Sequence, residues 1–149
     1  MISVIQLILM LIACCPRHEL NRDPVLLAEV AGYFEAAGDR YNVPPTLLVY
    51  WTYRESSLKT DAVGALGEIG LGQVHGVVRQ RCEDGGYDPA TYRGGIYCTA
   101  MLMDESRRFC GSLERGLVRY ASGSCKGTAR TRKKIKQRIR AWKRKINQK

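Results

Sequence analysis

The chain has 149 residues, of which 45% are hydrophobic and 26% are charged. These values are ordinary for one globular domain with one core, and they exclude a mainly disordered chain. The formal charge of +10 is unevenly spread, because residues 126–149 hold twelve Lys/Arg and no Asp/Glu. The rest of the chain carries twelve basic and fourteen acidic residues. We therefore expect a nearly neutral body with a strongly basic tail.

The first 15 residues, MISVIQLILMLIACC, contain no charged side chain. Their apolar run of about 13 residues is short for a membrane span, which needs roughly 20. It fits the core of a signal peptide better, although the usual positive charge is missing. An uncleaved anchor or a buried first helix are the alternatives. Residues 11–14, LIAC, resemble a bacterial lipoprotein box in which Cys14 would be acylated.

The rest of the chain is predicted to be mainly α-helical, because no period-two strand pattern is present. Residues 24–42 have apolar residues at helical spacing, with Asp23 as the expected N-cap and Pro24 at the first position. Glycines at 64, 67 and 70 predict a loop over residues 58–70. The further helices are expected over residues 45–57, 71–82, 94–109, 112–121 and 128–146, the last of these being the basic tail.

Six cysteines are present, and two of them belong to the N-terminal segment. The other four, an even number in a chain expected to be exported, predict two disulfides. Three pairings are possible. We favour Cys110 with Cys125, since they flank a short predicted helix, and Cys82 with Cys98 then closes the loop between them. A metal site is not expected, because the chain has two histidines and no Cys-x-x-Cys pair.

The helix over residues 45–57 ends in the stretch YRESS, which contains Glu55. Residues three and four apart share a helix face, so Leu48 and Trp51 are the expected neighbours of Glu55. A carboxyl group packed against an aromatic side chain loses solvation, which favours its protonated form. A general acid needs this property. In lysozyme, the catalytic glutamic acid acquires it by packing against a tryptophan. The alternative is a surface glutamate paired with Arg54.

Three short motifs follow one another in an order that resembles the lytic transglycosylases, goose-lysozyme-like enzymes that cleave peptidoglycan. They are Glu55-Ser56 at a helix end, GALGE followed by GLGQ at residues 64–68 and 70–73, and RYASG at residues 119–123. The resemblance covers roughly residues 25–125, and we take residues 24–125 as the catalytic domain. Ala121 departs from the family, which usually has asparagine there, and this leaves binding of the acetamido group in doubt.

The resemblance implies a single lysozyme-like helical domain in which Glu55 is both acid and base. Glu55 would protonate the oxygen between N-acetylmuramic acid and N-acetylglucosamine, and then accept the proton of the muramoyl C6 hydroxyl. The product would be a 1,6-anhydro sugar, without a cofactor. The expected substrate-binding residues are Ser56, Gly70, Leu71, Gln73 and Tyr120. Glu68 is either a second carboxylate that positions water, as in a lysozyme, or an acceptor for loop amides.

The basic tail is expected to bind an anionic cell-envelope surface, and glycan strands of peptidoglycan are the expected partner of the domain. Its apolar stripe, with Ile135 and Trp142, is expected either to pack on the domain or to lie in a membrane interface. Nucleic acid and a non-catalytic glycan-binding module are the rival interpretations. The protein is expected to be a monomer in the periplasm or envelope, or to act in phage lysis.

Overall fold

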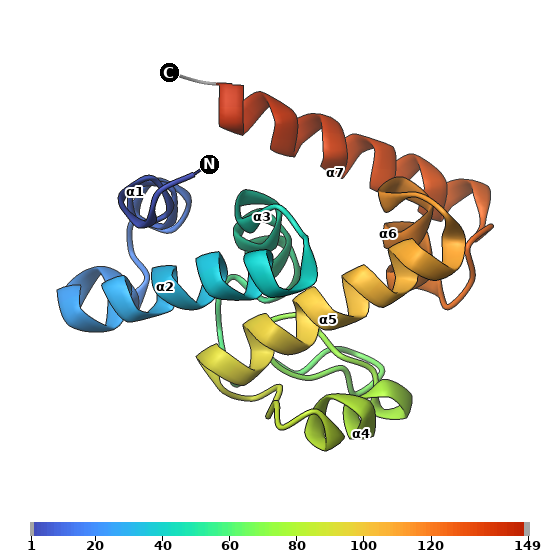
Figure 1. The fold of residues 1–149 in the computed structure, drawn as a ribbon, viewed down its shortest axis with the longest axis horizontal. Helices are drawn as coiled ribbons and strands as arrows, with labels where there is room; N and C mark the ends of the chain where they lie inside the picture. Colours follow the sequence, from blue (N-terminus) through green and yellow to red (C-terminus); the bar gives the residue numbers. More distant parts are fainter. Residues whose placement is uncertain (1, 148–149) are drawn as a thin grey trace. The chain divides into compact units, whose positions relative to one another are not determined.

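A computed structural model describes residues 2–147 as an α-helical protein (Figure 1). Its elements are α1 (Val4–Cys14), the 3-10 turn η1 (Glu19–Arg22), α2 (Pro24–Tyr41), α3 (Pro45–Ser56), α4 (Gly76–Asp84), α5 (Tyr92–Cys110), α6 (Leu113–Ser122) and α7 (Ala129–Asn147). Among these residues only isolated β-bridges occur, at Val63, Ile69 and Val74, and no strand. The predicted mainly α fold class is confirmed. The chain forms two compact units, residues 1–100 and residues 101–149.

In the first unit, α1 packs against both α2 and α3. Leu7 and Leu11 are at most 1% exposed, and the helix begins with a capping box between Ser3 and Gln6. The apolar N-terminal segment is thus a packed first helix in this structure. Removal of the segment as a signal peptide, and acylation of Cys14, stay predictions. None of the helices in residues 2–147 is both long and apolar enough to cross a membrane.

The helices α2 and α3 begin where the sequence places them. The Asp23 side chain accepts a hydrogen bond from the Leu26 N–H at 3.1 Å, and Pro24 is the first residue of α2. The left-handed residue Asn42, with φ 51°, ends α2 and lets the chain turn into α3. α3 then runs to Ser56, one residue short of the predicted end, because Ser57 has φ 54°.

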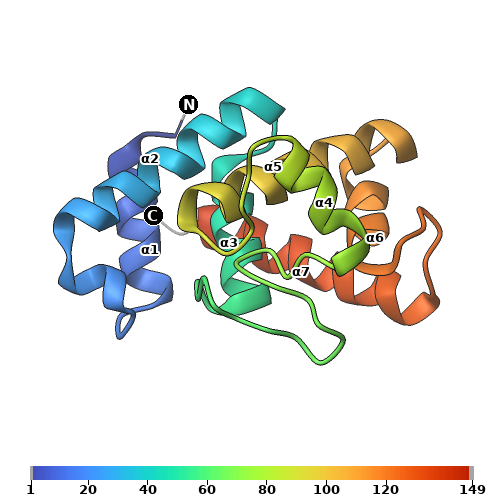
Figure 2. The ribbon, with the colours of Figure 1, turned by 90° about the horizontal axis from the view of Figure 1, so that it is seen from below.

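One predicted helix begins later than expected. Residues 71–82 were expected to be helical, but α4 begins at Gly76, with the His75 side chain accepting from the Val77 N–H at 3.3 Å. The preceding residues form a turn instead, since Gln73 has φ 49° and Val74 pairs with Ile69. Figure 2 shows the resulting connection between α3 and α4 as a long loop, drawn in green.

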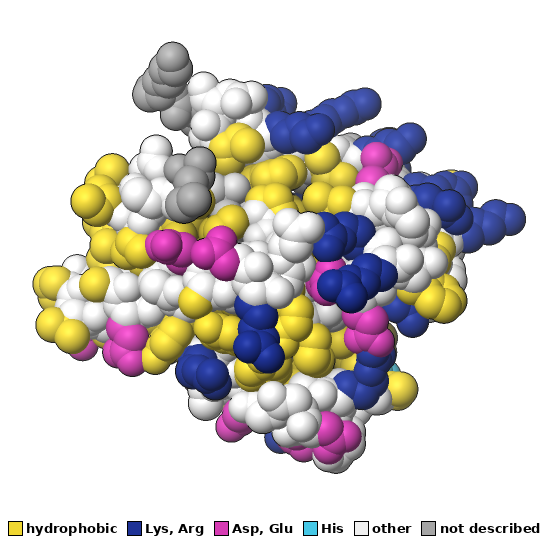
Figure 3. Space-filling model, viewed as in Figure 1, with side chains coloured by type: hydrophobic (Ala, Val, Ile, Leu, Met, Phe, Trp, Pro, Cys, Tyr) yellow, Lys and Arg dark blue, Asp and Glu magenta, His cyan; other side chains and the backbone are white. Residues whose placement is uncertain are grey.

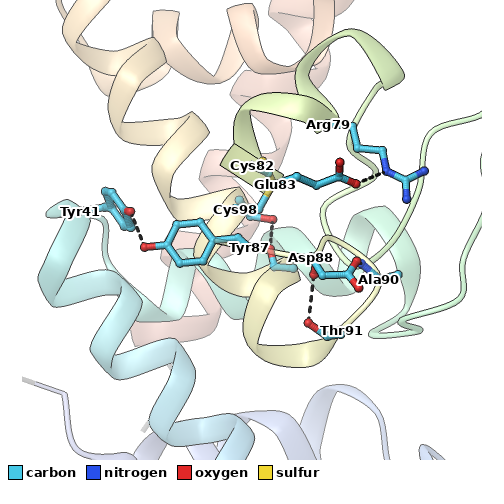
Figure 4. The surroundings of a disulfide bond; sticks show 11 residues. Tyr41, Arg79, Cys82, Glu83, Tyr87, Asp88, Ala90, Thr91 and Cys98 are labelled. Carbon is cyan, nitrogen blue, oxygen red and sulfur yellow. Dashed lines mark hydrogen bonds and ion pairs between the residues drawn. A yellow bond between two sulfur atoms is a disulfide. The ribbon is translucent and has the colours of Figure 1, made fainter. Parts of the chain in front are cut away.

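Both predicted disulfides are present. Cys82 and Cys98 join α4 to α5 with their Cα atoms 5.3 Å apart, and Figure 4 shows this bond in its surroundings. Cys110 and Cys125 have their Cα atoms 5.5 Å apart and link the end of α5 to the segment before α7. Each disulfide lies within one of the two units.

The second unit is built around α6 and α7, which pack on each other. The connection between them turns at Gly123, with φ 85°, and at Gly127, with φ 55°. A Cβ atom on Gly127 would lie 2.6 Å from Cγ1 of Val118, so this turn is held tightly against α6. On α7, Ile135 is fully buried and Trp142 is 8% exposed. Ile135 and Trp142 of the apolar stripe are therefore packed within the fold, whereas Ile146, near the end of α7, is 44% exposed.

Candidate active site around Glu55

Glu55 lies in the last turn of α3, where it is half-buried. Leu48 and Trp51, the residues expected on the same face, both have no exposed side-chain surface. The helix is continuous through this region. Trp51 and Leu48 therefore precede Glu55 by one and two helical turns on the same face, as the sequence indicated. A carboxyl group is thus held at the point where a fully buried helix face reaches the surface.

Ser56, predicted to lie near the acid, is 8% exposed. Its hydroxyl donates a hydrogen bond to the carbonyl oxygen of Thr52 at 2.9 Å, so it is used by the helix itself. The C-cap is the next residue, Ser57, whose N–H donates to the Tyr53 carbonyl at 2.8 Å. Ser56 therefore supports the end of α3, and while this hydrogen bond is kept its hydroxyl can accept a hydrogen bond from a substrate but cannot donate one.

The loop between α3 and α4 folds back on itself through backbone hydrogen bonds. The Gly64 N–H donates to the Glu68 carbonyl at 2.7 Å, and the Gly70 N–H donates to the Ala62 carbonyl at 2.9 Å. Ile69 exchanges two hydrogen bonds with Val74, at 3.1 and 2.9 Å. The GLGQ turn, residues 70–73, is therefore a defined structure whose position is fixed by the residues before it.

Gln73 is directed into this loop. Its side-chain nitrogen donates to the carbonyl oxygens of Ala62, at 3.2 Å, and Gly70, at 3.0 Å. An amide NH₂ group has two hydrogens, so both of its donors are used. Its oxygen lies over Gly64, since a Cβ atom there would be 2.6 Å from it. Gln73 thus shapes the turn, and any hydrogen bond to a sugar would be accepted by Oε1.

Glu68 is also turned toward its own loop. Its Oε2 accepts a hydrogen bond from the Leu66 N–H at 3.0 Å. A Cβ atom on Gly64 would lie 2.2 Å from the same oxygen, so a larger residue there would displace the carboxylate from this position. Of the two roles considered for Glu68, this geometry matches the acceptor for loop amides.

The GLGQ turn is braced from behind by residues 88–89. A Cβ atom on Gly70 would lie 1.9 Å from the carbonyl oxygen of Pro89, and one on Gly94 would lie 2.0 Å from that of Asp88. Leu71, fully buried, packs on Gly95 of α5. Gly70 was predicted to approach the sugar. In the structure, its lack of a side chain permits the close contact with Pro89. The sequence analysis did not identify this brace; the Asp-Pro pair at residues 88–89 is the signal from which a turn could have been predicted.

Tyr87 anchors the bracing loop. Its N–H donates to the Cys82 carbonyl at 2.8 Å, and its hydroxyl lies 2.7 Å from that of Tyr41 on α2 (Figure 4). Burial, and then the hydrogen bond with Tyr41, raise the pKa of the Tyr87 phenol. The guanidinium of Arg93 lies 4.9 Å from the ring centroid of Tyr97, which itself packs on Tyr87. This loop is therefore tied to α2, α4 and α5.

Tyr120 lies in the second unit, half-buried near the end of α6. The RYASG stretch that contains it forms a helix end, with Gly123 in the left-handed region and its N–H donating to the Arg119 carbonyl at 2.7 Å. The expected hydrogen bond from Tyr120 near Glu55 stays a prediction.

Within residues 2–147, no group of three or more His, Cys, Asp or Glu residues is arranged to hold a metal ion. In comparisons with known proteins, no family model matches the chain, and no solved structure matches it significantly. The residues around Glu55 are therefore the basis for inferring a function.

Proposed function

We propose that the protein is a peptidoglycan lytic transglycosylase in which Glu55 is the general acid and base. The observation that carries the proposal is the position of Glu55 one helical turn after the fully buried Trp51. A general acid must reach its substrate from a rigid support, and a half-buried carboxyl group in the last turn of a buried helix meets both conditions. The braced GLGQ turn that follows supplies a fixed backbone surface for a sugar.

In the proposed reaction, Glu55 donates its proton to the glycosidic oxygen as the bond to C1 of the muramoyl residue breaks. The N-acetylglucosamine unit leaves as an alcohol, and the sugar's own acetamide stabilises the positive charge at C1. The Glu55 carboxylate then accepts the proton of the C6 hydroxyl as its oxygen attacks C1. This step closes the 1,6-anhydro ring and restores protonated Glu55. One carboxyl group is sufficient, whereas most glycosidases use two.

Hydrolysis of the same bond, as in a lysozyme, is the alternative. That reaction needs a group that holds and activates a water molecule. Glu68 is the carboxylate considered for this role, and its Oε2 is engaged by the Leu66 N–H. This engagement supports transglycosylation over hydrolysis.

The substitution Glu55→Gln tests the proposal, because it keeps the shape of the side chain and removes the transferable proton. We expect purified Glu55→Gln protein to be folded and to release no soluble fragments from peptidoglycan. Glu114→Gln, at an exposed glutamate of α6, is the matched control and should keep full activity. Fragment release by Glu55→Gln at the wild-type rate would refute the assignment.

The proposed location is outside the cytoplasm, in the periplasm or cell envelope. The two disulfides support it, since such bonds persist in oxidising compartments. Glycan strands of peptidoglycan are the proposed partner, and the enzyme is proposed to act as a monomer.

A further inference from the structure

The cations of α7 are unevenly distributed around the helix. The side that packs on the protein carries Ile135, fully buried, with Arg138 and Trp142 at 8% exposure. At 3.6 residues per turn, one exposed flank then carries six cations: Arg132, Lys133, Lys136, Arg140, Lys143 and Arg144. The opposite flank carries Arg130, Lys134 and Lys145. No residue of α7 is acidic.

The flank of α7 with six cations contains a shallow groove of about 340 Å³. Its lining consists of Ala129, Arg132, Lys133, Lys136, Gln137 and Arg140. Four of these six side chains are cationic, and none is a carboxylate. Figure 3 shows dark blue side chains gathered over α7. We call this surface the basic groove.

The cations of the basic groove stand in a row along the helix. Arg132, Lys136 and Arg140 are four residues apart, which corresponds to steps of roughly 6 Å. Like charges at this spacing destabilise a helix. The row thus weakens α7, and an anionic polymer lying along it would relieve the repulsion.

The start of α7 is nevertheless held firmly. The Thr128 hydroxyl accepts from the Thr131 N–H at 3.1 Å, and Nη1 of Arg132 donates to the carbonyls of Lys126, at 2.9 Å, and Gly127, at 3.2 Å. The disulfide at Cys125 fixes the preceding segment to the end of α5. The charges therefore stand on a rigid support, which lowers the entropic cost of binding.

We propose that the basic groove is a second substrate-binding surface, which holds peptidoglycan through the free carboxylates of its stem peptides. The inference rests on the proposed function, since it assigns this surface to the same polymer. A row of cations in a groove suits an anionic chain. A lipid bilayer is disfavoured because Ile135 and Trp142, in the apolar stripe of α7, are buried and not available for insertion. Nucleic acid is disfavoured because the two disulfides indicate an oxidising compartment.

The test measures binding of the full chain, with Glu55→Gln added so that the substrate is not digested. The groove variant adds Lys133→Glu, Lys136→Glu and Arg140→Glu. Its control adds Arg130→Glu, Lys134→Glu and Lys145→Glu, which make the same change in charge on the opposite flank. Arg132 is left in place because it binds the turn before α7. Circular dichroism establishes that both variants are folded.

Each protein is sedimented with insoluble peptidoglycan and with peptidoglycan whose carboxylates have been converted to amides. We expect the groove variant to bind intact peptidoglycan about tenfold more weakly, and the control variant to lose much less. Amidation of the peptidoglycan should weaken its binding to the parent protein, which has an intact basic groove, to a similar degree. Equal losses in the two variants, or undiminished binding to the amidated polymer, would overturn the inference.

Two further probes address the rival ligands. Vesicles containing phosphatidylglycerol and a duplex DNA are tested at the same ionic strength. Tighter binding to either than to peptidoglycan, lost in the groove variant, would reassign the surface and overturn the proposal. The binding assay involves no turnover, so it tests the basic groove even if the protein does not catalyse the proposed reaction. If the wild type cleaves peptidoglycan but the groove variant binds it as tightly as the parent protein does, this inference is refuted and the proposed function is not.

Discussion

Gly70 and Pro89 approach so closely that no side chain fits between them. A Cβ atom on Gly70 would lie 1.9 Å from the Pro89 carbonyl oxygen, and Gly70 has φ 73°. Through this contact, the GLGQ turn rests on the loop that the Cys82–Cys98 disulfide closes. The proposed active site therefore depends on a brace that lies about twenty residues further along the chain.

The substitution Gly70→Ala should displace this brace. We expect it to lower the free energy of unfolding by roughly 2 kcal/mol or more, since it combines a backbone clash with a strained φ. Gly67→Ala is the matched control, because Gly67 has φ 84° but nothing within 4 Å of its Cβ position. Urea unfolding of both variants isolates the clash from the strain. Equal losses would show that the contact with Pro89 contributes nothing.

Removing the two disulfides separately should distinguish stability from activity. The double substitutions Cys82→Ser/Cys98→Ser and Cys110→Ser/Cys125→Ser open loops with sequence separations of 16 and 15. Each should cost roughly 3 kcal/mol on the chain-entropy model. Peptidoglycan cleavage, measured where both variants are folded, should fall further in the first variant, since its loop contacts Gly70. A greater loss in the second variant would contradict the bracing role.

Gln73→Glu should destabilise the loop although it changes few atoms. It removes the two donated hydrogen bonds to Ala62 and Gly70, and it places a second carboxylate near Glu68 across Gly64. We expect a loss of about 1–3 kcal/mol from the two lost hydrogen bonds and the repulsion between the carboxylates, measured by thermal unfolding. Gln137→Glu, at an exposed position of α7, should cost nothing comparable. An unaltered melting temperature for Gln73→Glu would show that its hydrogen bonds are dispensable.

The stability of the protein should fall at alkaline pH through Tyr92. Burial raises the pKa of this phenol above its ordinary value of 10.0, and the hydrogen bond to Glu19 at 3.1 Å raises it further. Above pH 10 the unfolded chain releases this proton while the folded chain retains it. The stabilising contribution is therefore complete below about pH 10 and is lost as the pH rises.

Tyr92→Phe removes this titration, so its unfolding free energy should decline less between pH 9 and pH 11 than that of the wild type. Tyr33→Phe is a control at a half-buried tyrosine whose pKa is raised mainly by its hydrogen bond to Glu29, and it should change the slope less. An identical decline in the Tyr92→Phe protein would show that Tyr92 does not cause it.

Local patterns in the sequence were sufficient to predict several features. Asp23 and Pro24 predicted the start of α2, and the cysteine spacing predicted both disulfides. Helical spacing alone was sufficient to place Leu48 and Trp51 on the buried side of the helix that carries Glu55. The helix features depend on residues within a few positions of one another. The disulfides were predicted from the even number of cysteines in a chain expected to be exported to an oxidising compartment.

Features that depend on contacts between distant residues were not predicted. The helix expected to begin at residue 71 begins at Gly76, because Gln73 binds Ala62 and Val74 pairs with Ile69. The inward orientation of Gln73 and the contact of Gly70 with Pro89 have the same origin. Short motifs pointed to particular residues of the loop without indicating which way their side chains are directed.

Mass spectrometry of the fragments that the protein releases from peptidoglycan tests the central claim most directly. The proposed reaction predicts muropeptides ending in 1,6-anhydromuramic acid, each one water lighter than the hydrolytic product, from the wild type. Glu55→Gln protein should release none. Reducing muramic acid ends from the wild type, or anhydro ends from the Glu55→Gln protein, would contradict the account.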